Sequence, residues 1–170
     1  MKFSISHEQA QHMRLLLSKA SALCPSIMVT SVDDVLRLQG MDSCQICLLD
    51  CQFRPEWFEG EVLFDGTVNH VATKVWASVL KIMDEDQMAA IHFDNGEMSI
   101  KLTGSDTSCN KEFTIPLLHL DNELINIDTV MTEESTAELC ITSKKFSDLV
   151  AQFEMFDEVL AFELSEAGIE

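Results

Sequence analysis

One local pattern, a strand followed by a helix and then a hairpin, occurs about three times along the chain and constrains the fold more than any other feature. Hydrophobic periodicity and turn signals define its elements. The first copy has its strand, helix and hairpin strands at 2–6, 7–23, 27–30 and 35–38. The second has its helix and hairpin strands at 70–83, 88–93 and 98–103, and the third has strand, helix and strand at 138–142, 143–153 and 159–164. Because repeats fix the architecture, the sequence predicts an α+β fold of β-α-β-β units.

Segments between the copies define the domain organisation. Further strands are expected at 45–51, 61–64 and 110–118. Residues 121–135 are acidic and have no clear periodicity, which is typical of a linker. We therefore expect a first domain at 1–120, an interdomain connector at 121–135, and an incomplete second domain at 136–170.

The net charge of −18 argues against a simple nucleic-acid binder, because phosphate is repelled at long range. The three predicted helices are an exception. They carry six of the eleven lysines and arginines and a net charge of +4, which leaves −22 on the rest of the chain. No apolar run is long enough for a membrane helix, and the first residues do not resemble a secretion signal. We expect no membrane partner and a reducing compartment.

The bases on these helices lie opposite the apolar residues. The apolar side of the second helix is expected to include Val75, Trp76 and Val79. At about 100° per residue, Lys74 and Lys81 share one azimuth, opposite Trp76 and Val79. Lys144 similarly lies opposite Phe146 and Phe153, which we expect to point inward. The simplest interpretation of one such helix is a solvated face. Three repeated helices that all carry a net positive charge, within an acidic chain, instead favour a surface that holds DNA through its phosphates, without reading bases.

The cysteines and acidic pairs do not indicate a catalytic or metal site. Cys44, Cys47 and Cys51 lie in a segment that we interpret as a strand, so we expect them to be small buried core residues. A structural zinc site would need a second cysteine pair. Acidic pairs at 33–34 and 84–86 could hold a divalent cation, but such residues in turns are usually solvated. No phosphate loop, nucleophile elbow or zinc-protease motif is present. We expect no enzyme activity, no metal and no cofactor.

The segment Leu38-Gln-Gly-Met-Asp-Ser-Cys-Gln-Ile-Cys-Leu48 resembles the corresponding segment of the proliferating cell nuclear antigen (PCNA) family of DNA sliding clamps. The Leu-Gln-x-Met-Asp-Ser core carries most of this resemblance. It extends over nearly the whole chain but covers only the N-terminal two-thirds of a typical clamp subunit, as in a viral or divergent member. The resemblance implies two units per domain, with helices lining a ring and antiparallel sheets outside.

The resemblance also implies which residues act. Arg14 and Lys81 match basic positions of the inner surface, and their placement adds further DNA-binding candidates: Lys19, Lys74, Lys144 and Lys145. Ser78 and Asp148 depart from positions that are often basic. The partner-peptide site of the family, an apolar pocket beside the connector, corresponds to Met41, Gln45, Ile46, Leu124, Ile125 and Ile127. Without the resemblance, core packing explains Met41 and Ile46 equally well, and a loop fixed to its own domain explains Leu124, Ile125 and Ile127.

The implied partners are duplex DNA, a DNA polymerase and other clamp-binding peptides, a clamp loader, and further copies of the chain joined through an edge strand near 110–118. The strand that closes the ring in this family would follow residue 170, so the chain is either a piece of a longer clamp or a shortened relative. The implied location is the nucleus, or a viral replication site. The alternative function is a clamp-like scaffold, of a viral accessory or checkpoint type, that recruits partners without encircling DNA.

Overall fold

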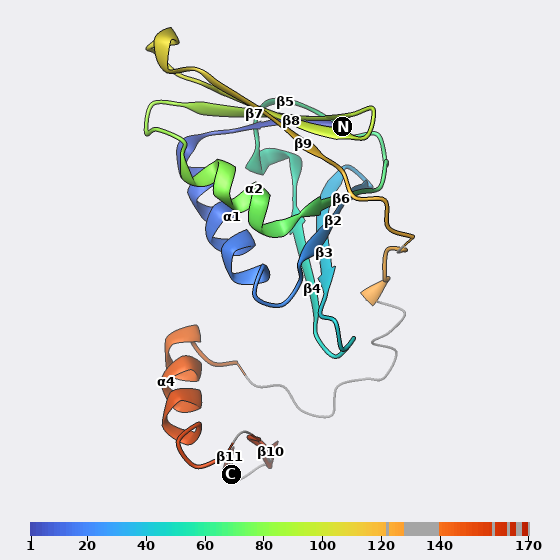
Figure 1. The fold of residues 1–170 in the computed structure, drawn as a ribbon. Helices are drawn as coiled ribbons and strands as arrows, with labels where there is room; N and C mark the ends of the chain where they lie inside the picture. Colours follow the sequence, from blue (N-terminus) through green and yellow to red (C-terminus); the bar gives the residue numbers. More distant parts are fainter. Residues whose placement is uncertain (122, 128–139, 158, 163, 166–167, 170) are drawn as a thin grey trace. The chain divides into compact units, whose positions relative to one another are not determined.

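The computed structural model describes residues 1–121, 123–127, 140–157, 159–162, 164–165 and 168–169 (Figure 1). The chain divides into two units, Met1–Leu124 and Ile125–Glu170. Residues 128–135 of the expected connector and residues 138–139 of the expected third-copy strand lie outside the described residues.

The first unit contains two sheets and two α-helices. Its α-helices are α1 (His7–Ala20) and α2 (Thr73–Lys81). Its strands are β1 (Lys2–Ile5), β2 (Ser26–Val32), β3 (Val35–Met41), β4 (Leu48–Phe53), β5 (Glu59–Leu63), β6 (Asn69–Ala72), β7 (Met88–Asp94), β8 (Glu97–Thr103) and β9 (Lys111–Pro116). The strand order is β5-β1-β7-β8-β9 in one sheet and β4-β3-β2-β6 in the other. The predicted α+β fold with β-α-β-β units is therefore confirmed.

The two copies of the repeat exchange their first strands. β1 of the first copy pairs antiparallel with β7 of the second, with Lys2 opposite His92. Reciprocally, β6 of the second copy pairs antiparallel with β2 of the first, with Ser26 opposite Ala72. Each hairpin is thus completed by a strand of the other copy, so neither copy forms its sheet alone.

The symmetry continues beyond the strands of the hairpins. β4 follows β3 and pairs with it, as β9 follows β8 and pairs with it. β5 then pairs with β1, and Leu118 forms an isolated antiparallel bridge with His70 of β6. The chain after β9 therefore occupies the position in the second half that β5 occupies in the first.

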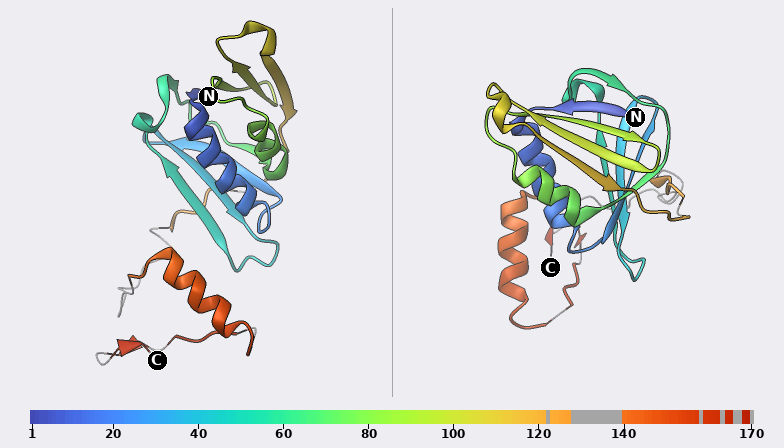
Figure 2. Two further views of the ribbon diagram at one scale, coloured as in Figure 1. Left: turned by 90° about the vertical axis from the view of Figure 1, so that its left-hand side faces the viewer. Right: turned by 45° about the horizontal axis from the view of Figure 1, so that its top comes forward.

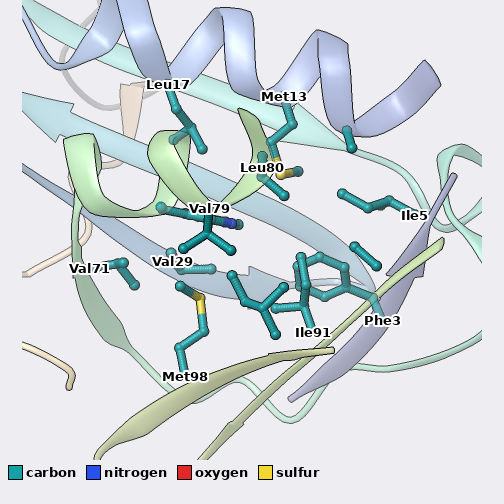
Figure 3. Close-up of a cluster of buried hydrophobic side chains, with 14 of the residues drawn as sticks. Phe3, Ile5, Met13, Leu17, Val29, Val71, Val79, Leu80, Ile91 and Met98 are labelled. Carbon is teal, nitrogen blue, oxygen red and sulfur yellow. The ribbon is translucent and has the colours of Figure 1, made fainter. Parts of the chain in front are cut away.

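The hydrophobic core lies between the sheets and the two helices (Figure 3). Helix α1 contributes Met13 and Leu17, and α2 contributes Trp76 and Leu80, all of which are fully buried. Strands of both sheets contribute the rest of the cluster, including Phe3, Ile5, Ile27, Val29, Ile91, Met98 and Ile100. Because the helices bury one side each, their polar sides face away from the sheets.

Local sequence signals explain several element boundaries. Ser6 and Gln9 form a capping box at the start of α1, with the Ser6 side chain accepting from the Gln9 N–H and Gln9 Oε1 accepting from the Ser6 N–H. The β7–β8 hairpin turns at Asn95 and Gly96, which both have positive φ (49° and 80°). This is the backbone of a type I′ turn, which favours that residue pair.

Three predictions for the first unit are wrong in detail. Helix α1 ends at Ala20, three residues early, and Leu23 is exposed. The second helix is shorter than predicted because residues 70–72 belong to β6, and Val75, expected on its apolar side, is exposed. Cys44 and Cys47, expected in a strand and buried, are exposed in a loop before β4. The reason is that the Asp42 carboxylate binds the backbone N–H groups of this loop, which a strand would have paired instead.

The second unit contains α4 (Ser143–Phe153), at the predicted bounds, with β10 (Leu164–Ser165) and β11 (Gly168–Ile169) paired antiparallel. The predicted strands are not found at 140–142 or 159–162. Phe146 and Phe153, expected to point inward, are 44% and 48% exposed, and no residue of α4 is buried. Amphipathic spacing thus predicted the helix correctly, but it cannot ensure that a sheet covers the apolar side. No described helix of either unit is long and apolar enough to cross a membrane.

Candidate nucleic-acid interface

Helices α1 and α2 lie side by side (Figures 1 and 2). Side chains of both helices line a shallow groove of about 170 Å³. We call it the basic groove; its lining residues are Arg14, Ser18, Ser21, Lys74, Ala77, Ser78 and Lys81. Three of the six predicted DNA-binding residues, Arg14, Lys74 and Lys81, therefore lie together. Lys19 is exposed in the last turn of α1 but does not line the groove.

The spacing of side chains explains why these residues converge. Arg14, Ser18 and Ser21 stand at positions i, i+4 and i+7 of the α1 segment, and Lys74, Ser78 and Lys81 have the same spacing in α2. Residues at this spacing share one side of a helix. The buried residues of α2, such as Trp76 and Leu80, occupy the other side. The serines were not among the predicted site residues, although this spacing could have identified them.

No acidic side chain pairs with the groove cations among the residues that the structure describes. The ion pairs among the described residues lie outside the groove and join the Met1 ammonium to Asp65 and Lys111 to Asp84. Arg14 Nε donates to Gln11 Oε1 at 2.8 Å, a neutral acceptor that leaves the guanidinium charge in place. Ser78 Oγ donates to the Lys74 carbonyl at 2.8 Å. The basic groove thus presents positive charge without an acidic partner, which suits phosphate oxygens.

Lys144 and Lys145 lie on the second unit, exposed in the first turn of α4. The Thr142 side chain caps this helix by accepting from the Lys145 N–H. Cations in a first helical turn oppose the helix dipole, so these lysines do not contribute to helix stability. The structure does not relate them to the basic groove, because they belong to the other unit.

Met41, Gln45 and Ile46, predicted for peptide binding, lie at the end of β3 and in the loop 42–47, which we call the Asp42 loop. Asp42 Oδ1 accepts from the N–H groups of Ile46 and Cys47 at 2.8 Å each. These hydrogen bonds, of which the one from the Cys47 N–H has the largest effect, hold the pKa of Asp42 below its usual range. Gln45 has a left-handed φ of 58°, and Ile46 is 87% exposed. The loop therefore presents an apolar side chain to solvent from an ordered backbone.

Leu124 lines a pocket of about 440 Å³ at the start of the connector, with Val68, His70, Leu118, His119, Leu120, Asp121 and Glu123. Val68, Leu118 and Leu120 are 52%, 39% and 41% exposed. These three residues were not predicted, although the alternation of Leu118 and Leu120 after a strand was a possible signal. His70 is buried, which lowers its pKa.

Ile125 and Ile127 are half-buried and belong to the second unit. Of the six predicted peptide-binding residues, Leu124 lines this pocket, whereas Met41, Gln45 and Ile46 do not. The two isoleucines belong to the other unit, which the structure does not place relative to the first. No group of three or more histidine, cysteine or carboxylate side chains that could hold a metal ion occurs within the described part of the chain.

Comparison with solved structures identifies the fold. The chain superposes on PCNA from Thermococcus kodakaraensis with a TM-score of 0.64 and 13% identity, over 74% of this chain and 49% of that one. It superposes on a chain of the PCNA2–PCNA3 complex from Sulfolobus tokodaii with a TM-score of 0.65 and 16% identity, over 92% and 61%. The chain has a PCNA-like clamp fold. It spans about half to three-fifths of the length of these PCNA chains.

No family model matches the chain, and no curated protein matches it. Recognition of the PCNA-like fold therefore depends on the structure and on the short sequence resemblance at 38–48. The basic groove lies on the two helices of this fold, whereas the Asp42 loop follows a strand of its four-stranded sheet. The two candidate surfaces are thus built by different elements of one unit.

Proposed function

We propose that this protein is a DNA sliding clamp of the processivity-factor type, without catalytic activity, that contacts duplex DNA through its basic helices. The observation that supports this most strongly is the meeting of Arg14, Lys74 and Lys81 in one groove of an otherwise acidic chain. A phosphate backbone is attracted to this groove and repelled by the rest of the surface. Contacts of this kind hold DNA without sequence preference, which a sliding clamp requires.

Partner docking is the second part of the proposal. Peptides of a DNA polymerase, a clamp loader and other clamp-binding proteins would place apolar anchors against Met41, Ile46 and the connector residues. An exposed isoleucine on an ordered loop is a suitable contact for such an anchor, because its backbone loses little freedom on binding. Gln45, Leu124, Ile125 and Ile127 complete the proposed surface. The proposed location is the nucleus, or a viral replication site.

Self-association is the third part of the proposal. Strand β9 forms one edge of the five-stranded sheet. An edge strand presents unpaired backbone groups that can pair with a strand of another chain. We propose that copies join through β9, and that chains of this fold assemble around DNA in this way.

Salt-dependent binding to a fluorescein-labelled duplex tests the DNA contact. Four cations of the first unit, the three in the groove and Lys19, predict a slope of log K against log salt of about −3.6 per chain. In the double variant Lys74→Glu/Lys81→Glu, binding at low salt falls roughly tenfold or more and the slope becomes shallower by about 2. The matched control is Lys101→Glu, because Lys101 is exposed on β8, on the side of the sheet away from the buried residues.

Equal losses in the groove variant and the Lys101 control would refute the proposed interface. The alternative function, a scaffold that recruits partners without holding DNA, predicts a different result. In that case neither the wild-type protein nor any variant binds the duplex at low salt. Ile46→Asp still weakens binding of a fluorescent clamp-binding peptide.

A further inference from the structure

Cys44 and Cys47 form a Cys-x-x-Cys motif in the Asp42 loop, and both thiols are exposed. The loop is closed by two backbone hydrogen bonds, from the Asp42 N–H to the Cys47 carbonyl and from the Gln45 N–H to the Asp42 carbonyl, each 3.1 Å long. Gln45, between the cysteines, has a left-handed backbone that reverses the chain direction. The two cysteines therefore lie on one tight turn and not along an extended strand.

The Asp42 carboxylate limits how far apart the cysteines can be. Its Oδ2 accepts from the Cys44 N–H at 3.2 Å, and its Oδ1 accepts from the Cys47 N–H at 2.8 Å. Both backbone nitrogens are thus held against one carboxyl group. A disulfide needs Cα atoms about 4.4–6.8 Å apart. The turn allows a Cα–Cα distance in this range, whereas two residues three positions apart on an extended strand are farther from each other.

The neighbouring cysteines are poorer candidates for this chemistry. Cys24 is fully buried, and its sulfur fills the space beside Gly40. Cys51 is half-buried on β4, four residues from Cys47 along an extended strand. Burial raises the pKa of both thiols, which disfavours the reactive thiolate. Of these four cysteines, only Cys44 and Cys47 combine exposure with a shared turn.

We propose that Cys44 and Cys47 form a reversible intramolecular disulfide by exchange with a low-molecular-weight disulfide such as oxidised glutathione. One protein thiolate attacks the external disulfide, forms a mixed disulfide and releases one thiol. The second protein thiolate then attacks the mixed disulfide and releases the other thiol. Two electrons pass from the protein sulfurs to the external disulfide, and the two protein protons end on the released thiols.

This disulfide would regulate the loop that carries Gln45 and Ile46. The closed ring would fix the turn and the position of the exposed Ile46 side chain. Its effect on partner docking rests on the function proposed above, whereas its formation does not.

The test uses the 170-residue chain in glutathione buffers of graded redox poise, followed by alkylation, trypsin cleavage and mass spectrometry. Trypsin cleaves after Arg37 and Lys74 but not at the Arg54–Pro55 bond, which leaves Cys44, Cys47 and Cys51 in one peptide, 38–74, and Cys24 in peptide 20–37. In oxidising buffer we expect peptide 38–74 to lose about two mass units and to alkylate at Cys51 alone. Cys51→Ser should retain the loss, as the matched control.

In Cys44→Ser and Cys47→Ser, we expect one glutathione adduct on the remaining loop thiol and no mass loss. Two results would overturn the proposal. One is the formation of adducts at both cysteines of the wild-type protein without any ring. The other is a cross-link between peptides 20–37 and 38–74, which would assign the disulfide to Cys24. Because the readout uses neither DNA nor a partner peptide, it is independent of the clamp function.

Discussion

Gly40 is the position at which a single methyl group should disturb the core most directly. It lies on β3 opposite Leu49 of β4. A Cβ atom at Gly40 would meet the Cys24 sulfur at 2.9 Å and the Cys24 Cβ at 3.1 Å. Favourable contacts between such atoms are about 3.5–4.0 Å long. Cys24 is fully buried, so its sulfur cannot move into solvent to relieve the overlap.

The expected cost of Gly40→Ala follows from this overlap. An extra methyl group in a closely packed core destabilises a protein by about 1–3 kcal/mol, and two contacts well inside normal distance place Gly40→Ala in the upper half of that range. Cys24→Ala removes the sulfur and should cost about 1 kcal/mol by itself. In the double variant the overlap with the sulfur is removed, and of the two close contacts the one at 3.1 Å remains. We therefore expect the two substitutions to interact favourably by about 1–2 kcal/mol.

Urea unfolding of the four proteins, followed by tryptophan fluorescence, measures this interaction. Trp57 and Trp76 both belong to the first unit, so the signal reports the unit that contains Gly40. A wild-type stability in Gly40→Ala would contradict the packing argument. So would additivity of the two substitutions within about 0.3 kcal/mol, because it would show that Cys24 is not the residue that resists the methyl group.

Two further predictions concern the N-terminal part of the first unit. Partial burial raises the pKa of Asp65, but hydrogen bonds from the Met1 ammonium and from Thr67 outweigh it and lower the pKa to about 2. Since the Asp65 side chain is 38% exposed, solvent screening reduces its expected contribution to about 1 kcal/mol. Asp65→Asn should lose this stability at pH 7 and about half as much at pH 3, because the contribution is present above the ordinary aspartate pKa and is lost as pH falls towards 2. Urea unfolding at both pH values measures the two losses. An equal loss at each pH would contradict the prediction. Ser6→Ala should lower the free energy of unfolding by about 0.5–1 kcal/mol through loss of the α1 cap, whereas Ser6→Asp should remain near wild type. Thermal melts followed by circular dichroism compare the two variants. Equal melting temperatures for the Ala and Asp variants would exclude a capping role.

Features with a local physical cause were accessible from the sequence. The bounds of α4, the capping box of α1 and the Asn95–Gly96 turn follow from residues within a few positions of each other. The outward direction of Lys74 and Lys81 follows from helical periodicity in the same way. The Asp42 loop shows the limit of this approach: its apolar residues favour a strand, but one carboxylate provides the loop with its hydrogen bonds.

The sequence by itself determined the repeated unit, its α+β class and the positive charge of its helices, because each depends on spacing along one segment. Only the tertiary structure decided that β1 and β6 are exchanged between the two copies, and this exchange places α1 beside α2. It thereby brings Arg14 to Lys74 and Lys81 across about sixty residues of chain. Such a meeting depends on which strands pair, and strand pairing is selected by the packing of the whole core and not by any local pattern.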